Sequence, residues 1–383
     1  MTSRAPVCRD FAAGAPPRVA HLIASAQKRA AVIDLAEDDR RHAATIAQWD
    51  ADPWLLGTPG GTVDLRSGEL REARREDFIT RCAAVVPSAM PTPHWDALLA
   101  RALDGDLDLV AYLQRVAGYA LTGETREHAL MFLYGTGANG KSTVLNALSG
   151  VLGDYAISAP MESFVATTGD RHPTDLAMLR GARLVSASET ESGRRWAESK
   201  IKALTGGDPI SARFMRGDFF TYSPQFKLVL SGNHRPALRD VDEAMRRRFH
   251  LVPFTVTIPA EERDPRLPEK LRAEWPGILA WAIRGCLEWQ RGGLRPPDRV
   301  RAATDSYLAA EDTLARWLEE SCHVGRDHED TGARLFGSWQ AWCEAGEEHV
   351  GSKKRFSQRL EERGFAAGWV QRVRGFNGLA VSS

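Results

Sequence analysis

The chain has 383 residues, 43% of them hydrophobic and 26% charged, which is typical of a globular protein with two or three domains. Lys and Arg together number 50, as do Asp and Glu, so the formal net charge of zero excludes a uniformly basic or acidic protein. Because the sequence has no apolar run of membrane-spanning length, no signal peptide and no C-x-x-C pair among its five cysteines, we expect a cytoplasmic protein with reduced thiols and no membrane partner.

The positive charge is unevenly distributed along the chain. Residues 194–250 contain twelve Lys and Arg against six Asp and Glu, and residues 351–383 contain seven against two. Such asymmetry suggests a polyanionic partner, although a basic solvated face is the commoner meaning of a charge run.

The first part of the chain is expected to be largely helical. Residues 1–45 predict an N-terminal segment that is partly flexible or helical. Residues 46–125 predict a mainly helical domain, in which turn dipeptides between residues 50 and 77 indicate a small hairpin and apolar residues at helical spacing follow from residue 95 to 119.

A phosphate-binding loop is the strongest motif, and it lies within ALMFLYGTGANGKSTVLNALSGVL, residues 129–152. An apolar run meets G-x-x-x-x-G-K-S, and apolar residues at helical spacing follow, which is the order of strand, glycine loop and helix that ATP binding through a P-loop requires. Lys141 is expected to reach the β- and γ-phosphates and Ser142 to hold Mg²⁺. The residues expected to bind the nucleotide are Gly135, Thr136, Gly137, Ala138, Asn139, Gly140, Lys141, Ser142 and Thr143.

Two further polar groups follow predicted strands. The apolar strand 183–188 ends at Glu189 and Glu191, which are candidates for binding Mg²⁺ and positioning the attacking water, Glu189 first; two solvated glutamates are the alternative. The strand 226–230 is followed by Asn233, whose amide is placed to orient that water.

Basic residues mark two more features of this region. Strands 210–214 and 219–223 predict a hairpin whose tip contains Arg216; it is either an ordinary turn or an element that contacts DNA. A helix that starts near residue 241 ends in three arginines, which are either a solvated helix end or include an arginine finger for a neighbouring subunit.

The remainder of the chain predicts two parts. Residues 259–328 are expected to be helical, with tryptophans used for packing and a linker at 325–331. Residues 329–383 predict helix, turn, basic helix and β-ribbon, the order of a winged helix. Its expected DNA contacts are Lys354, Arg355, Arg359, Arg372 and Arg374.

These segments together resemble the superfamily 3 helicases, specifically the C-terminal helicase part of phage, plasmid and poxvirus-type primase-helicases. The resemblance covers most of the chain from about Trp49 and is carried by several separate segments. They are DADPWLLGTPGGTVDLRSGEL, YLQRVAGYALTG, FLYGTGANGKST, RLVSASETESG, KALTGGDPISAR, FKLVLSGNHRP, RRRFHLVPF and EWPGILAWAIRGCLEWQRGGL.

The resemblance implies an α/β fold: an AAA+ P-loop ATPase core at 126–258 with a mainly parallel sheet, an N-terminal helical region and a C-terminal winged helix. It further implies a homo-hexameric ring that draws single-stranded DNA through its pore, usually with 3′ to 5′ polarity. Asn233 matches the family's sensor asparagine, and Glu189 and Glu191 match its acidic strand end. Arg248, with Arg247 as the alternate, matches the trans-acting arginine; Arg216 matches the pore loop, with Lys202 and Arg213 as supporting DNA contacts.

Two departures from the family pattern qualify these expectations. About 48 residues precede the resembling part and contain no D-x-D pair, so priming is not expected from this chain, and a separate primase or polymerase is a possible partner. The pore tip has one arginine where relatives can have two basic residues. A monomeric P-loop kinase or switch, and an initiator that binds origin DNA without unwinding it, are the alternatives.

Overall fold

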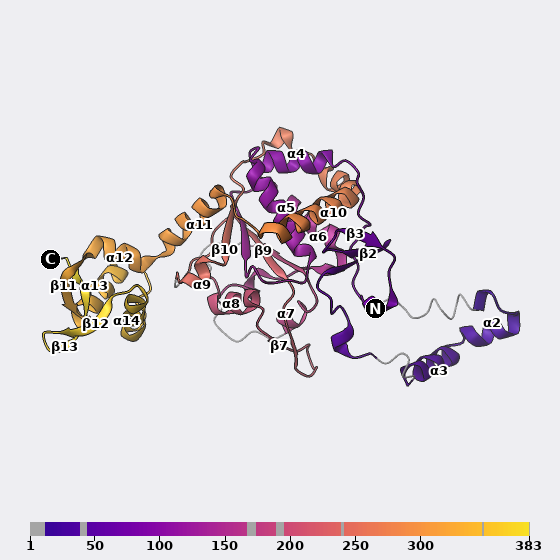
Figure 1. Ribbon diagram of the computed structural model, residues 1–383, viewed down its shortest axis with the longest axis horizontal. Coiled ribbons are helices and arrows are strands. Elements are labelled where there is room, and N and C mark those ends of the chain that lie inside the picture. Colours follow the sequence, from indigo (N-terminus) through magenta and orange to yellow (C-terminus); the bar gives the residue numbers. More distant parts are fainter. Residues whose placement is uncertain are drawn as a thin grey trace. The chain divides into compact units, whose positions relative to one another are not determined.

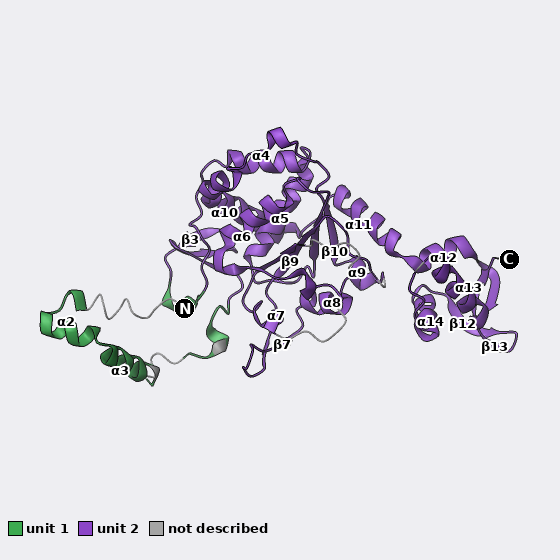
Figure 2. Cartoon of the chain, turned by 180° about the vertical axis from the view of Figure 1, so that it is seen from behind, with its two compact units in different colours: residues 1–51, 74–80 green, residues 52–73, 81–383 purple. Residues whose placement is uncertain are grey.

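The structure is a computed structural model that describes residues 12–38, 44–166, 174–188, 195–238, 241–346 and 348–382. The chain divides into two compact units, the first of residues 1–51 and 74–80 and the second of residues 52–73 and 81–383 (Figure 2). The units therefore do not follow the predicted boundary at residue 45, because residues 46–51 and 74–80 associate with the N-terminal segment.

Unit 1 is helical in its described part, as predicted for this segment. It contains α2 (Pro17–Ala24) and α3 (Ala26–Glu37), with the short 3₁₀ helices η2 (Ile46–Gln48) and η3 (Arg75–Asp77). The hydroxyl of Ser25 accepts a hydrogen bond from Lys28 N at 3.3 Å and caps α3. Trp49 packs edge-on against Phe78, with ring centroids 5.3 Å apart.

Unit 2 begins with a small antiparallel sheet of β1 (Leu55–Thr58), β2 (Gly61–Asp64) and β3 (Glu69–Arg71), so the predicted hairpin has a third strand. The helices α4 (Pro93–Ala102) and α5 (Leu107–Leu121) follow. The long helix α10 (Leu267–Gly292) packs against α5. A Cβ at Gly118 of α5 would lie 2.0 Å from Cys286 N, so the close approach of these helices requires glycine at this position.

A five-stranded parallel sheet forms the centre of unit 2, and the α/β prediction is thereby confirmed (Figure 1). Its spatial order is β10-β4-β9-β6-β5. The strands are β4 (Leu130–Tyr134), β5 (Ala156–Ser158), β6 (Leu184–Ser188), β9 (Lys227–Gly232) and β10 (Phe249–Pro253). Associated with them are α6 (Lys141–Leu152), η4 (Gly153–Tyr155), η5 (Met161–Ser163), α7 (Thr174–Ala177), α8 (Glu198–Gly206), α9 (Glu243–Arg246) and η6 (Ala260–Glu262).

Side chains of β4 alternate between two hydrophobic cores. Met131 and Leu133 belong to the core that also contains the buried residues of α4, α5, α6 and α10, whereas Leu130 and Phe132 belong to the core on the other face. Because both faces are covered, the strand is apolar throughout, as the uninterrupted run in the sequence predicts. Trp281 and Trp289 are buried in the first core, which agrees with their predicted structural use.

The strands β7 (Ile210–Ala212) and β8 (Phe220–Tyr222) pair antiparallel and form the predicted hairpin. The hairpin projects from the body of unit 2 in Figure 1. Its register places Ala212 opposite Phe220, so the seven residues between these two form the tip.

The C-terminal part has the element order of a winged helix, preceded by α11 (Asp298–Glu311). Its elements are α12 (Thr313–Ser321), β11 (Cys322–Thr331), α13 (Gly332–Ala345), α14 (Lys353–Glu362), β12 (Ala366–Val370) and β13 (Val373–Val381). The strands form a sheet of order β11-β13-β12, and α12, α13, α14 and the sheet enclose one hydrophobic core. We refer to residues 313–382 as the winged-helix module.

Two predictions for this part are wrong. Residues 325–331, predicted as a linker, belong to β11, where Glu329, Asp330 and Thr331 pair with β13. Their polar sequence has no strand pattern. Pairing with a distant strand determines their conformation, and local sequence does not reveal such pairing. The module also begins before residue 329: Leu314 and Trp317 of α12 are in its core, although the sequence assigns them to the helical part at 259–328.

Candidate functional site

A glycine loop joins β4, which lies between β10 and β9 in the parallel sheet, to α6. Gly135 has φ +155°, and a Cβ there would lie 2.0 Å from the carbonyl oxygen of Phe254, which excludes every larger residue. Gly140 has φ +84° and is the N-cap of α6. The two glycines therefore allow the turn that brings the N-terminus of α6 to the end of β4.

Lys141, the first residue of α6, is held inside this loop. Its Nζ donates to the carbonyl oxygen of Gly135 at 2.6 Å, to Asn139 Oδ1 at 3.0 Å and to Asn233 Oδ1 at 3.4 Å. The residue is 5% exposed, and burial lowers the pKa of its amine. All three acceptors are neutral, so a bound anion would stabilise the ammonium form that the site destabilises.

Asn139 has a supporting role that sequence reasoning missed. Its amide Nδ2 donates to the carbonyl oxygens of Thr136 at 3.0 Å and Phe254 at 2.9 Å, while Oδ1 accepts from Lys141. This buried side chain therefore fixes both the loop and the lysine. Asn139 occupies one of the x positions of G-x-x-x-x-G-K-S, and an asparagine at such a position does not by itself indicate a structural role.

The outer part of the loop suits a phosphate group. Thr136, Gly137 and Ala138 are exposed, and no atom lies within 4 Å of a Cβ built on Gly137. Ser142 is also exposed, at the first turn of α6. The donor set of backbone N–H groups, an ammonium and a hydroxyl matches what the phosphates of a nucleotide and a magnesium ion require.

Asn233 lies where the order in which the chain adds strands to the sheet reverses. The chain continues from β4 to the far edge at β5, but from β9 it continues to β10 on the other side of β4. Ligands of open α/β sheets bind at the carboxyl ends of strands at such a switch point. Asn233 follows β9 and meets Lys141 at this place, whereas the predicted magnesium-binding Glu189 and Glu191 lie outside the described residues.

The two arginines that follow α9, Arg247 and Arg248, differ in their surroundings. Arg248 is 8% exposed, and its guanidinium donates to Thr205 Oγ1 at 3.2 Å and to the carbonyl oxygen of Ala244 at 2.8 Å. Burial lowers its pKa. Arg247 is exposed. A side chain that reaches a neighbouring subunit must be accessible, and of these two residues Arg247 meets this condition.

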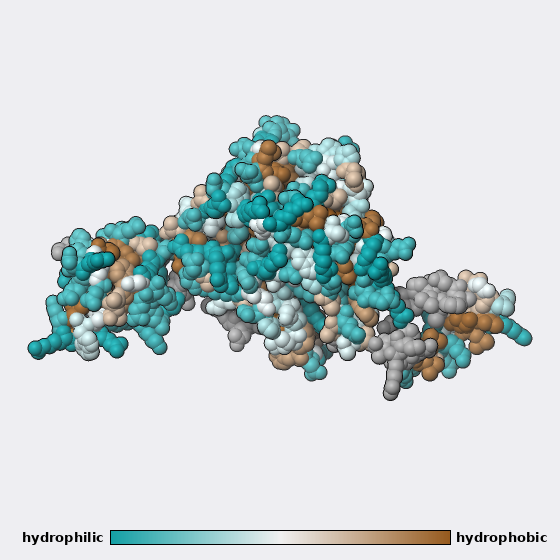
Figure 3. Space-filling model, in the orientation of Figure 1, coloured by the Kyte–Doolittle hydropathy of each residue, from teal (hydrophilic) through white to brown (hydrophobic). Residues whose placement is uncertain are grey.

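The hairpin brings basic and apolar side chains together at its exposed tip. Figure 3 shows hydrophilic and hydrophobic residues side by side on this projection. Arg216 is exposed with φ +60°, and the Cζ atom of Arg213 lies 4.7 Å from the ring centroid of Phe219. Phe214, Met215 and Phe219 are 51%, 70% and 61% exposed. The two phenylalanine rings, to which sequence reasoning assigned no individual contact, suit stacking on unpaired bases. Lys202 differs, because its Nζ is hydrogen-bonded to Asp242.

The basic residues of the winged-helix module fall on two elements. Lys354 is exposed on α14, with Arg355 and Arg359 partly buried on the same helix. Arg372 is exposed in the turn between β12 and β13, and Arg374 is exposed on β13. Trp369 lies directly opposite Arg374 across the strands and is 75% exposed, although no motif in the sequence marks it.

The parallel sheet, the glycine loop and the helix that starts at Lys141 define the class of the protein as an α/β protein of the P-loop type. Two family models match: "D5 N terminal like" over residues 11–104 and "Family of unknown function (DUF5906)" over residues 133–248. Together with the curated viral relatives, these matches show that the chain is similar to viral putative helicases and primases, the resemblance that its motifs indicate.

Viral proteins are among the curated relatives. "Putative helicase 022R" of Frog virus 3 is 25% identical over 62% of this chain, and "Putative helicase L207/L206" of Acanthamoeba polyphaga mimivirus is 27% identical over 67%. "Putative primase C962R" of African swine fever virus is 22% identical over 76%. The alignments cover 26%, 29% and 33% of these relatives, so this chain spans about a quarter to a third of their length.

Among solved structures, the apo C-terminal region (305–718) of NrS-1 matches with a TM-score of 0.49 and 9% identity. The match covers 87% of this chain and 83% of that one. A likeness this distant says nothing about function, which is therefore inferred from the strand order and loop geometry of the chain itself. Across the described ranges, no helix has the length and apolarity to cross a membrane.

Proposed function

We propose that this protein is an ATP-dependent DNA helicase of a phage, prophage or plasmid replication system, which acts as a homo-hexameric ring on single-stranded or forked DNA. The observation that carries the proposal is the meeting of Lys141 Nζ and Asn233 Oδ1, 3.4 Å apart, at the end of two adjacent parallel strands. Viral relatives named as putative helicases and as a putative primase support the replicative setting.

The loop residues bind and orient the nucleotide in this proposal. Backbone N–H groups of residues 135–143 and the ammonium of Lys141 bind phosphate oxygens, and Ser142 with Glu189 holds Mg²⁺. Magnesium, when bound, neutralises charge that develops on the phosphates. Asn233 orients the attacking water and detects the γ-phosphate; Glu189, with Glu191, assists in placing that water.

A neighbouring subunit completes the site. An arginine after α9 supplies positive charge to the transferring phosphoryl group of the adjacent subunit. Arg247 suits this function by its exposure, and Arg248 supports the turn in which Arg247 lies through its bonds to Thr205 and Ala244. The exposed tip of the β7–β8 hairpin, with Arg216, contacts the phosphates of the strand in the pore.

The decisive experiment measures ATP hydrolysis with and without single-stranded DNA, followed by strand displacement on a forked duplex. A helicase is stimulated by DNA and displaces the strand. ATP hydrolysis indifferent to DNA would favour a monomeric kinase or switch. DNA binding without displacement would favour an origin-binding initiator, an alternative that the winged-helix module suggests.

A further inference from the structure

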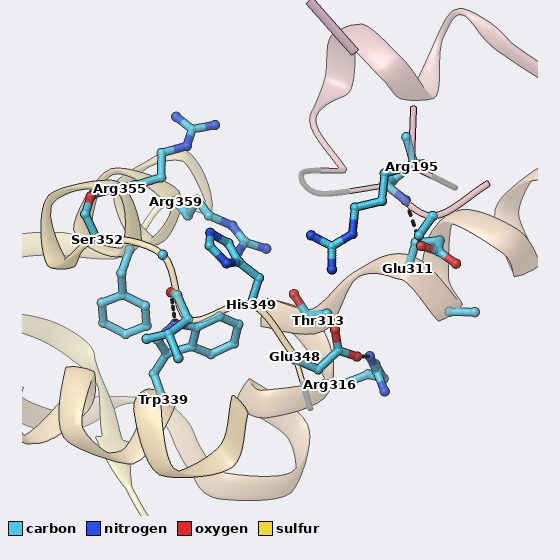
Figure 4. A pocket seen from close by; sticks show the side chains of 16 residues that line it. Arg195, Glu311, Thr313, Arg316, Trp339, Glu348, His349, Ser352, Arg355 and Arg359 are labelled. Carbon is cyan, nitrogen blue, oxygen red and sulfur yellow. Dashed lines mark hydrogen bonds and ion pairs between the residues drawn. The ribbon is translucent and has the colours of Figure 1, made fainter. Parts of the chain in front are cut away.

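A cavity of 530 Å³ lies where the winged-helix module faces the segment before α8 (Figure 4). Its lining includes residues from the ATPase core, from the start of α12 and from α14, where the lining residues are Arg355, Phe356 and Arg359. The charged members are the guanidinium groups of Arg195, Arg316, Arg355 and Arg359 and the carboxyl groups of Glu311 and Glu348.

Both carboxyl groups have partners at the wall. Glu348 Oε1 accepts a hydrogen bond from Arg316 Nη2 at 2.6 Å. Glu311 Oε2 accepts one from the backbone N of Leu238 at 2.8 Å, and burial raises the pKa of this carboxyl group, which favours its uncharged form. With four guanidinium groups against two carboxyl groups, the lining has an excess of positive charge.

The basic groups approach the cavity from opposite sides. Figure 4 shows the Arg195 side chain extending from the core side towards Arg359 and the ring of His349 on the other side. The guanidinium of Arg359 lies over Trp339, 5.6 Å from the ring centroid, and Trp339 Nε1 donates to the carbonyl oxygen of Val350 at 2.8 Å. This wall is therefore fixed by packing.

One further feature favours an anion as the ligand. The N-terminus of the ten-residue helix α14 adds positive potential at Ser352. Planar guanidinium groups match the oxygens of a phosphate, and they bind it through paired hydrogen bonds.

We propose that this cavity binds a phosphate group of a nucleic-acid strand between Arg195 of the ATPase core and Arg359 of the winged-helix module. The inference rests on the proposed function for the identity of the anion. The exposed Lys353 and Lys354 on the same helix continue the basic surface along which the strand leaves the cavity. One bound phosphate would connect the ATPase core with the winged-helix module, so DNA binding by the module would restrain the movement of the core.

The test is DNA affinity as a function of salt concentration, measured by fluorescence anisotropy with a fluorescent forked DNA. Arg195→Ala and Arg359→Ala are compared with the full-length parent and with Arg284→Ala, a control for an exposed arginine on α10. We expect each cavity variant to bind roughly 3- to 10-fold more weakly, with the salt slope reduced by about 0.7 to 0.9. The control should match the parent, and all melting temperatures should agree.

Affinities and salt slopes equal to those of the control would overturn the proposal. Tripolyphosphate is the probe for a free anion: protection of the parent but not of Arg195→Ala against thermal unfolding, with unchanged DNA affinity, would assign the cavity to a small anion and also overturn it. A parent that binds DNA and shows DNA-stimulated hydrolysis keeps the helicase proposal intact in either case, whereas a parent that does neither refutes both.

Discussion

The side chains of Lys141 and Asn233 meet across two parallel strands, with Nζ 3.4 Å from Oδ1, although 92 positions separate them in the chain. Because β9 lies directly between β4 and β6, the residue after β9 reaches the phosphate loop without any long side chain. In the proposed function, this oxygen of Asn233 would lose its hydrogen bond from Lys141 when a bound phosphate accepts that bond instead.

Lys141→Ala should abolish ATP turnover while the protein remains folded. The substitution removes the ammonium inside the loop, and loss of a preorganised donor at a developing charge reduces kcat by about 100-fold or more. Steady-state hydrolysis and circular dichroism measure the two expectations. Asn146→Ala, an exposed position on the same helix α6, is the control. Hydrolysis near the parental rate in Lys141→Ala would contradict the assignment of the loop.

The arginines after α9 should separate into a catalytic and a structural residue. We expect Arg247→Ala to retain nucleotide binding and lose turnover, with the stability of the fold unchanged, since this side chain is exposed. Arg248→Ala should instead lower the free energy of unfolding by about 1–3 kcal/mol, because it removes buried bonds to Thr205 and Ala244. Urea denaturation and hydrolysis assays measure both.

Mixing variants tests whether Arg247 acts on a neighbouring subunit. Arg247→Ala and Lys141→Ala each lack a different half of a shared site, so mixed assemblies should regain part of the turnover. Mixtures that stay inactive, although the two variants assemble together, would argue against an arginine supplied in trans. The reverse pattern, with Arg248→Ala stable and rescued by mixing, would restore the assignment that the motif alone suggests.

The sequence predicts the parts of this site that depend on local chemistry. The apolar run of β4, the glycines and Lys141 form a contiguous pattern, and the order of strand, loop and helix is evident from it. The difference in exposure between Arg247 and Arg248 is not evident from the sequence, because two adjacent arginines have the same local pattern. The packing of α8 against α9 places Thr205 beside Arg248, and no local signal predicts that contact.

The strand β11 shows the same limit in the fold. Residues 325–331 have the polar, glycine-containing composition of a linker, yet they belong to β11, and Glu329, Asp330 and Thr331 pair with β13 more than 40 positions further along the chain. Non-local pairing of this kind leaves no periodicity in the sequence. The β7–β8 hairpin, in contrast, is local, and its turn residues are sufficient to predict it.

Arg216→Ala should weaken DNA-stimulated hydrolysis and leave the DNA-independent rate unchanged. The side chain is exposed at the tip of the hairpin, so its loss removes a phosphate contact and should reduce the salt slope of single-stranded DNA binding by about 0.7. Titration of hydrolysis with oligonucleotide at several salt concentrations measures the effect, with Arg284→Ala as the control. Equal stimulation of variant and parent would place the DNA contact elsewhere.

His250 should make the stability of unit 2 depend on pH. Burial lowers the pKa of its ring from 6.5 to about 4, and its Nδ1 lies 2.6 Å from the hydroxyl of Tyr112. The unfolded chain therefore binds more protons between these two values, so the free energy of unfolding falls as the pH decreases through this range. From pH 7 to pH 5 this residue should contribute a loss of about 2 kcal/mol.

His250→Gln removes the titrating ring, so urea denaturation at pH 7 and pH 5 should show a smaller decrease for this variant than for the parent. His21→Gln, which alters an exposed histidine of unit 1, should retain the parental decrease. The comparison uses the difference between the two pH values, so a lower stability of the variant at both does not affect it. A parental decrease in His250→Gln would mean that other groups determine the acid sensitivity, and that the ring near Tyr112 is protonated in the folded protein as readily as in the unfolded chain.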